Sequence, residues 1–340
     1  MPKVLSPDFD GATISTTGAA GKKIFVGSTD PSVSLPSGAS ALQAGDLWIP
    51  SGSLLATVDL PDTTTPGTPA ADNVRMFSQD IGGRSMLAMV GSSGAGTPLQ
   101  PHLGRNAISA WHALGGSTTA PTAVGAAALS ATGTATALVV ASTSLYTTMR
   151  QIEWLVTAAS NSAVVGWRLG ANNWLRGSAA GQGGFHFVCR LGVATGSTLS
   201  TRRFFCGLTS QTAAPTDVQP STDTTLANVI GIGADSTDTN YQFMTKTGTG
   251  TATKVNTGIA KAASADRTDV LEISIFCAPN GGTIFYTITK LNTGATFSGS
   301  TSTTLPATTQ VLGPLCYASV GGTSSVMGLG FRSMTIESDN

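Results

Sequence analysis

Residues 269–291 read DVLEISIFCAPNGGTIFYTITKL, and this stretch decides the fold class. Apolar side chains occupy every second position in each half of it, at Leu271, Ile273, Ile275, Ile284, Tyr286 and Ile288. A period of two residues is typical of a β-strand that buries one face. The turn residues PNGG at 279–282 separate the two halves, so the stretch predicts an antiparallel β-hairpin.

Strand-like runs of the same kind recur from about Leu138 to the end of the chain. Examples are RQIEWLVTA, GGFHFVCRLG, RRFFCGLTS and LANVIGIGAD, and clusters of turn residues separate them. About ten short strands without a comparable amphipathic helix predict an all-β sandwich of two antiparallel sheets. We therefore expect residues 138–340 to form a jelly-roll-like domain with no large helix.

A second hairpin is predicted upstream, within a docking module at residues 71–116. The runs NVRMFSQD and SMLAMVG lie on either side of Gly82 and Gly83, and two glycines supply the positive φ angles that a tight hairpin turn requires. The segment GSSGAGTPLQPH that follows (91–102) lacks the lysine and the helix start of a phosphate-binding loop, so it is interpreted as a bend. Small residues and threonine fill residues 117–137, which we interpret as a linker.

Residues 1–70 are predicted to form an extended N-terminal attachment arm. They are rich in Gly, Ser, Thr and Pro and contain few apolar residues, so the segment cannot order itself by burying its own core. Neighbouring chains would then hold it in place. Leu47, Trp48 and Ile49 form one apolar anchor within it and are candidate docking residues.

The composition is poor in charge. Charged residues make up 11% of the chain, against roughly 25% in typical soluble proteins. The 18 basic and 18 acidic residues give a formal net charge of zero, which does not favour nucleic acid or an anionic membrane as a partner. Because low net charge promotes self-association, we expect the protein to belong to an assembly. The sequence has no long apolar run and no signal peptide, so we expect neither membrane insertion nor export.

The histidines and cysteines predict no metal, cofactor or catalytic site. His102, His112 and His186 have no metal-ligand spacing, and His186 in FHFV is expected on the solvated side of its strand. No Cys-x-x-Cys pair occurs, and an unexported protein keeps its thiols reduced. The cysteines are therefore expected to be buried and inert, at Cys189, Cys206, Cys277 and Cys316.

The carboxylates favour turns and solvated strand faces over hydrolytic chemistry. A glycosidase needs two carboxylates that face one cleft, and nothing in the sequence pairs them. The loop GADSTDTN (233–240) is the densest polar cluster, with Asp235, Asp238 and Asn240. Its spacing does not match that of a calcium loop, so it is either a capped turn between strands or a cation or receptor site of another kind. The only glutamates are Glu153, Glu272 and Glu337.

Two tryptophans are candidate carbohydrate-binding residues. Trp167 and Trp174 flank the segment RLGANN, which could present aromatic faces and amides to a sugar. The alternative is that both indoles belong to the hydrophobic core.

Three blocks of sequence carry a resemblance to a known family. They are GDLWIPSG (45–52), VRMFSQDIGGRSMLAMVGSSGAGTPLQPHLGRNAISAW (74–111), and a β domain with RRFFCGLTS, IGIGADSTDTNYQFMT and KVNTGI. Their order resembles that of tail-fibre or receptor-binding proteins of tailed bacteriophages. The C-terminal block is similar to the concanavalin-like jelly rolls of phage fibre proteins.

The resemblance implies a homotrimeric virion protein that is assembled in the host cytoplasm. Its N-terminal part would dock onto tail or baseplate proteins, and its β domain would face a host-surface glycan or pilus. The matching motif carries no catalytic residue and no cofactor. The sequence shows neither heptads nor short solenoid repeats, which favours a compact adhesin or tail-tip protein. A capsid decoration or head-fibre protein and a host-glycan depolymerase are the alternatives.

Overall fold

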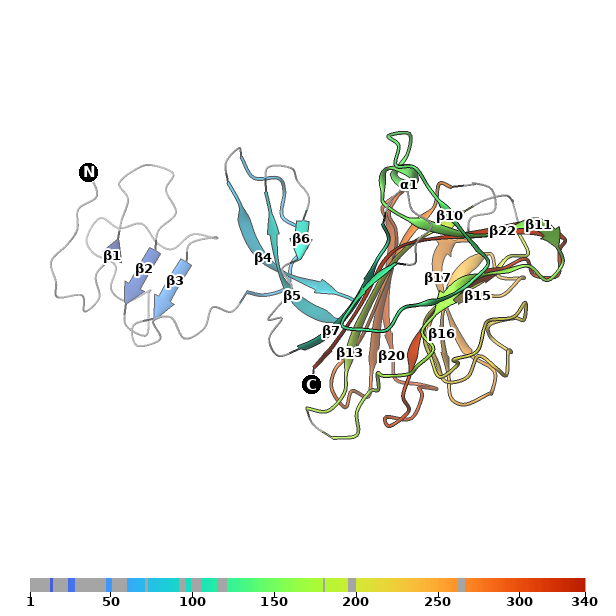
Figure 1. The fold of residues 1–340 in the computed structure, drawn as a ribbon. Helices are drawn as coiled ribbons and strands as arrows, with labels where there is room; N and C mark the ends of the chain where they lie inside the picture. The colour runs from blue at the N-terminus through green and yellow to red at the C-terminus, as the bar shows by residue number, and fades with distance from the viewer. Residues whose placement is uncertain are drawn as a thin grey trace. The chain divides into compact units, whose positions relative to one another are not determined.

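The computed structural model divides the chain into two compact units, Met1–Pro61 and Asp62–Asn340. It describes residues 60–70, 73–91, 96–98, 106–114, 121–179, 181–194, 200–261 and 267–339, together with three short strands nearer the N-terminus. In the first unit, β1 (Thr13–Ile14) pairs antiparallel with β2 (Ile24–Gly27), and β2 pairs in parallel with β3 (Leu47–Pro50) (Figure 1). The side chains of the predicted anchor on β3 lie outside the described residues, so their docking role stays a prediction.

The second unit is built around two antiparallel sheets that pack face to face (Figure 1). The first sheet has nine strands, in which β7 pairs with both β22 and β8 beside the path β10-β11-β22-β13-β18-β19-β20. Its bounds are β7 (Asn106–His112), β8 (Thr122–Val124), β10 (Thr134–Ala137), β11 (Ile152–Ser160), β13 (Phe185–Ala194), β18 (Val270–Cys277), β19 (Ile284–Lys290), β20 (Ala295–Thr301) and β22 (Ser325–Asp339). The prediction of an all-β sandwich is confirmed.

The second sheet has seven strands in the order β17-β16-β15-β14-β21-β12-β9. Its bounds are β9 (Ser130–Thr132), β12 (Val164–Arg168), β14 (Arg203–Thr209), β15 (Val229–Ala234), β16 (Asn240–Lys246), β17 (Thr253–Ala260) and β21 (Gly313–Ser319). Within the described part of the chain, α1 (Leu145–Thr148) is the one helix, and no helix there is long and apolar enough to cross a bilayer.

The opening stretch forms the hairpin of β18 and β19. Ile273 lies opposite Ile288 and Ile275 opposite Tyr286, and all the alternating apolar side chains are buried between the sheets. Asn280 takes a φ of 55° in the turn, a left-handed conformation that asparagine tolerates well. The period of two therefore predicts both the strands and the buried face correctly.

Aromatic contacts join the two sheets through the core. Phe243 of β16 stacks on Tyr286 of β19 with ring centroids 3.6 Å apart. At the other end of the sandwich, Trp154 of β11 packs against Trp167 of β12 at 5.3 Å, and Phe331 of β22 meets Trp167 edge-on at 4.9 Å. Such contacts add to the stability of the fold beyond the effect of the apolar area that they bury, because rings in offset or edge-to-face geometry attract one another.

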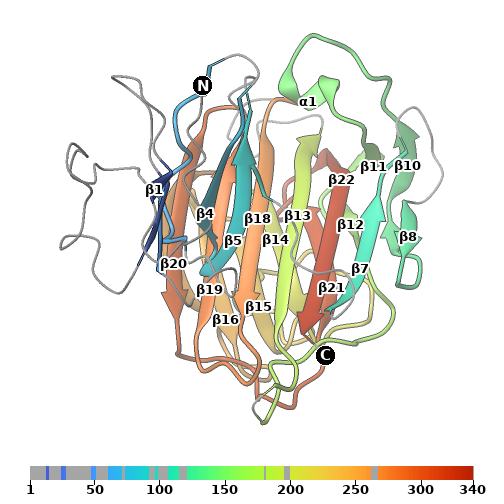
Figure 2. The ribbon, with the colours of Figure 1, turned by 90° about the vertical axis from the view of Figure 1, so that its left-hand side faces the viewer.

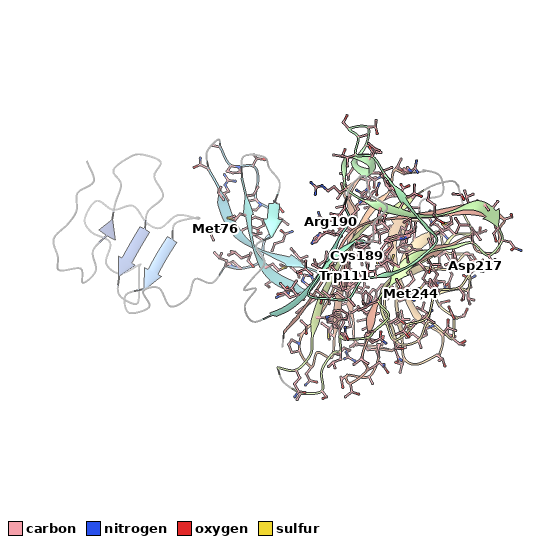
Figure 3. All side chains as sticks on the ribbon, viewed as in Figure 1. Met76, Trp111, Cys189, Arg190, Asp217 and Met244 are labelled. Carbon is pink, nitrogen blue, oxygen red and sulfur yellow. The ribbon has the colours of Figure 1, made fainter. Side chains whose placement is uncertain are left out.

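The cysteines lie inside this core, as predicted. All four are buried and free, and Cys206 lies directly opposite Cys316 on β14 and β21. Burial raises the pKa of Cys316 to about 11 and raises the pKa values of Cys189 and Cys206 as well, so the thiols stay protonated at neutral pH. Figure 3 shows Cys189 and Trp111 within the sandwich.

The prediction of a linker at residues 117–137 is wrong for its described part, because residues 122–137 contribute β8, β9 and β10 to the sandwich. Leu129 is buried there, and Ala123 and Ala135 pack against the core. The predicted docking module also does not extend to residue 116, because β7 pairs with β22 and buries Trp111 in the core of the sandwich. Short edge strands made of alanine and threonine lack the large alternating side chains that identify a strand in sequence.

The predicted upstream hairpin is confirmed. It consists of β4 (Arg75–Ile81) and β5 (Arg84–Val90), and β6 (Gly96–Pro98) pairs with β5 beyond the bend. Gly82 and Gly83 have φ angles of 63° and 87°, as a two-residue turn of this kind requires. The turn packs on the outer face of the nine-stranded sheet, where a Cβ on Gly83 would lie 2.0 Å from Cγ of Phe285. Figure 2 shows β4 and β5 in front of β18 and β19.

Replacing Trp167 by alanine tests the aromatic core. The indole is 0% exposed, so Trp167→Ala leaves a large cavity, and we expect the free energy of unfolding to fall by about 3–5 kcal/mol. Urea unfolding followed by far-ultraviolet circular dichroism measures the change. Val139→Ala is the control because Val139 is 77% exposed, and it should change stability by less than about 0.5 kcal/mol. Equal effects of the two variants would contradict the assignment of Trp167 to the core.

Candidate functional site

Several carboxylates that the structure describes at buried positions pair with the protein's own cations, whereas the buried Asp223 accepts hydrogen bonds from Thr225. Glu337 pairs with Arg84, Glu153 with Arg267 and Asp217 with Arg203, at 2.5, 2.9 and 2.7 Å. Asp269 likewise pairs with Lys290 at 3.0 Å. Their negative charges are compensated inside the fold, so these groups stabilise packing and do not line a shared cleft.

A polar cluster fastens the β4–β5 hairpin to the nine-stranded sheet. Arg84 donates to both carboxylate oxygens of Glu337, at 2.5 and 3.1 Å, and its side chain is only 14% exposed. Beside this pair, Nε2 of His186 and Oγ of Ser274 are hydrogen-bonded at 2.9 Å. Gly82 lies directly above Ser274, where a Cβ would be 2.9 Å from Oγ. The hairpin therefore covers a patch of sheet that would otherwise be solvated.

The position expected for His186 is wrong for this reason. Its neighbours Phe185 and Phe187 do point into the core, but the opposite face of the strand is not solvated and His186 is 4% exposed. Burial and, to a smaller extent, the nearby guanidinium of Arg84 together lower the pKa of His186 to about 4, although Glu337 opposes the shift. The imidazole is neutral at pH 7.

The acidic loop is a capped turn closed by two lysines. Asp235 accepts hydrogen bonds from the backbone NH and the hydroxyl of Ser221, and Asp238 accepts one from the backbone NH of Asp235. Nζ of Lys254 lies 3.1 Å from Asp235 and 2.6 Å from Asp238. Nζ of Lys261 donates a hydrogen bond to the backbone carbonyl of Asp235 in the same turn.

These contacts commit the carboxylates of the loop to partners within the fold, and a receptor role for the loop stays a prediction. Asp235 is 6% exposed, and Asn240 bonds Asn256 outside the carboxylate cluster. Burial tends to lower the pKa of Lys254, but the hydrogen bonds that its ammonium donates to Asp238 and Asp235 raise the pKa above its ordinary value, so the ammonium already occupies the place of a cation. Among the described residues no group of three His, Cys, Asp or Glu side chains could hold a metal ion.

The tryptophan prediction is corrected in favour of the core. Trp167 is completely buried in the aromatic cluster, and Trp174 is 6% exposed and packs edge-on against Trp111 at 6.3 Å. Neither indole can stack on a sugar. The amides of the same loop do reach a cavity of about 460 Å³, which is lined by Asn173, Leu175, Gly181, Gln182, Gly183 and Ser338. This cavity contains no charged group.

A second cavity, of about 380 Å³, lies where the hairpin turn meets the edge of the nine-stranded sheet. We call it the hairpin pocket, and its lining residues are Asp80, Gly83, Phe285, Tyr286, Ser298, Gly299 and Ser300. They come from the end of β4, the turn, β19 and β20. The pocket thus combines one carboxylate, the half-buried ring of Phe285, the buried ring of Tyr286 and two serine hydroxyls, which is a set of groups that can bind a small polar ligand.

No sequence pattern relates the residues of the hairpin pocket to one another. Asp80 lies next to a glycine turn, where an aspartate is usually explained as a turn residue, and Ser298 and Ser300 lie in a strand of ordinary polar alternation. The signal that could have indicated them is the FSGS segment at 297–300, because a glycine between two outward hydroxyls marks a place where another group approaches the strand closely.

The buried histidine predicts a loss of stability in acid. The folded-state pKa of His186 is below its unfolded value, so the unfolded chain binds more protons between pH 6.5 and about 4. Unfolding free energy should therefore fall by about 3 kcal/mol from this group as the pH drops from 7 to 4. Urea titrations at several pH values measure the slope. His186→Asn should remove this contribution, whereas His112→Asn, at an exposed histidine of β7, should retain it. An unchanged slope in His186→Asn would show that the imidazole is not responsible.

Comparison with known proteins gives structural similarity alone. No protein-family model matches the sequence, and no curated protein sequence is similar to it. Arcelin-5, a lectin-like defence protein from Phaseolus vulgaris, is 10% identical with a TM-score of 0.44, and the match covers 69% of this chain and 98% of that one. Lectin I from Ulex europaeus, solved with the methyl glycoside of α-L-fucose, gives 10% and 0.43 with the same coverage.

The solved structures that are similar to this chain also include an enzyme. A family 7 alginate lyase, A1-II′, solved in complex with substrate, is 12% identical with a TM-score of 0.35, and the match covers 56% of this chain and 79% of that one. The fold class rests on this chain's own strand pairing, which gives the all-β, jelly-roll-like sandwich that the sequence predicts.

Proposed function

We propose that this chain is a non-enzymatic receptor-binding protein of a bacteriophage tail. In this proposal the N-terminal part docks onto tail or baseplate proteins, and the sandwich contacts the host cell surface. The resemblance of residues 45–52 and 74–111 to tail-fibre proteins supports the virion context. The proposed assembly is a homotrimer.

The observation that carries the proposal is the attachment of the hairpin to the sandwich. The bidentate pair of Arg84 and Glu337 is largely removed from water, and breaking one partner of such a pair costs about 3–5 kcal/mol. The segment that follows the N-terminal unit is thereby fastened to the distal domain within one compact unit. In a receptor-binding protein, such an attachment would keep the hairpin and the sandwich together while the sandwich is bound to a cell.

The surface of the sandwich supports contact with polar host molecules. On the outer face of β19 and β20, Thr287 pairs with Ser298 and Thr289 with Thr296 through their hydroxyls, at 2.8 and 3.0 Å. Hydroxyls both donate and accept hydrogen bonds, so this face suits a glycan better than a charged polymer.

Competition for host cells tests the proposal. Purified full-length chain, added in excess to the host before particles that carry it, should slow adsorption of those particles because it occupies their receptors. Adsorption is measured as free particles remaining over time, with heat-unfolded chain as the control. Antibody to the sandwich should label the distal end of the tail on intact particles.

Two results would contradict this assignment. Label on the capsid together with unimpaired adsorption would support a decoration or head-fibre protein. Shortened host glycan after incubation with the chain alone would support a depolymerase. The trimer is tested separately by native mass spectrometry, where a stable single copy of the 34.2-kDa chain would exclude it.

A further inference from the structure

The hairpin pocket has the composition of a sugar site. We propose that it binds one neutral sugar residue, with Asp80 accepting hydrogen bonds from sugar hydroxyls, Phe285 contacting the apolar face of the ring, and Ser298 and Ser300 completing the polar contacts. The inference rests on the proposed function for its biological meaning, since a sugar of the host surface would be the ligand. Its chemistry is argued from the pocket alone.

Asp80 is exposed, and one of its two carboxylate oxygens is open to a ligand. Its Oδ1 accepts a hydrogen bond from the backbone NH of Gly83 at 2.6 Å, which fixes the carboxylate at the turn. Its Oδ2 has no hydrogen-bond partner in the part of the chain that the structure describes, and no cation pairs with it there. Arg84, the nearest basic residue in sequence, is committed to Glu337. A carboxylate oxygen held in place and left open accepts strong hydrogen bonds from a ligand's hydroxyls.

The ring of Phe285 is held rigidly at the pocket wall. It stacks on Phe276 with centroids 6.4 Å apart, and Gly83 packs so closely that a side chain there would collide with the ring. The ring is half-buried and still lines the pocket. Because the hairpin already fixes the ring of Phe285, ligand binding would not lose conformational entropy by ordering this side chain.

β20 supplies the opposite wall. A Cβ on Gly299 would lie 2.6 Å from the hydroxyl oxygen of the buried Tyr286, so the glycine lets that ring pack under the strand. Ser298 and Ser300 flank it and are exposed. Ser300 lies directly opposite Phe285 in the register of β19 and β20, so its hydroxyl is placed beside that ring on the outer face of the sheet.

Charge and size together select the ligand class. The one charged group of the lining is the carboxylate of Asp80, so sugars that carry a carboxylate or phosphate are repelled and neutral sugars are preferred. A volume of about 380 Å³ is near the lower end of the roughly 300–1,000 Å³ that ligand pockets occupy. This favours a single sugar residue over an extended chain.

Saturation-transfer NMR on the full-length chain tests the proposal. The probes are the methyl glycosides of glucose, galactose, mannose and N-acetylglucosamine, with N-acetylneuraminic acid as the anionic comparison. At least one neutral glycoside should receive saturation, and the anionic sugar should receive less. Asp80→Asn, which keeps the Oδ1 acceptor for the turn, should weaken binding at least tenfold. The absence of transfer to every neutral glycoside would overturn the proposal.

Matched variants locate the site. Ser298→Ala lies in the pocket and Thr296→Ala lies two residues away on the same face of β20, and each removes one hydroxyl of a cross-strand pair. We expect Ser298→Ala to weaken binding several-fold and Thr296→Ala to leave it unchanged. Equal effects would show that the hairpin pocket is not the site. Loss of binding in Asn173→Ala instead would place the sugar in the cavity at residues 173–183 and would also overturn the proposal.

The sugar site and the proposed function fail separately. If antibody labels the tail tip and the chain competes for host cells, but no neutral glycoside binds, the sugar site is wrong and the receptor-binding function stands. If neutral glycosides bind through Asp80 but the chain is found on the capsid, the site is right and the tail assignment is wrong.

Discussion

The pair of Arg84 and Glu337 is the interaction on which the outer half of the molecule depends. It joins residues 253 positions apart in the chain and brings the β4–β5 turn down onto the nine-stranded sheet. Once the turn is there, His186 and Ser274 are covered, Phe285 is fixed, and the hairpin pocket has its second wall. Buried ion pairs gain little net stability over apolar packing, but an unpartnered charge in such a place is very costly. The pair therefore determines where the hairpin can dock more than how strongly the sandwich folds.

Because the chain has few charged residues, each buried charge has few possible partners. With 18 basic and 18 acidic residues in 340, most of the buried carboxylates that the structure describes have a particular cation beside them, as in the contacts of Lys254 with the 235–238 turn. Few alternative pairings exist, so the register of distant segments is well specified. The surface is kept soluble mainly by hydroxyl and backbone groups, which also explains why cross-strand threonine and serine pairs are left on the outer face of β19 and β20.

Sequence patterns predicted those features that are local. The alternation in 269–291 and the two glycines at 82 and 83 each specify a hairpin through neighbouring residues, and both hairpins are present. Features that depend on a distant partner were missed. His186 was expected in water because a strand pattern cannot show what covers its second face, and Trp167 and Trp174 were ambiguous because a large side chain beside a loop fits a core and a surface equally well. The hairpin pocket combines Asp80 with residues more than 200 positions later, and no local pattern relates them.

The place of the pocket couples ligand binding to the fastening of the hairpin. Its walls come from two separate elements, so a ligand that contacts Asp80 on one side and β20 on the other binds only when the turn is docked on the sheet. By mass action such a ligand stabilises the docked arrangement, by about 2.7 kcal/mol when its concentration is a hundred times its Kd. Ligand binding and the Arg84–Glu337 pair would therefore both stabilise the docked position of the same turn. If the chain holds a particle to a cell as proposed, a ligand in the pocket would strengthen the attachment of the β4–β5 hairpin to the sandwich while the particle is bound.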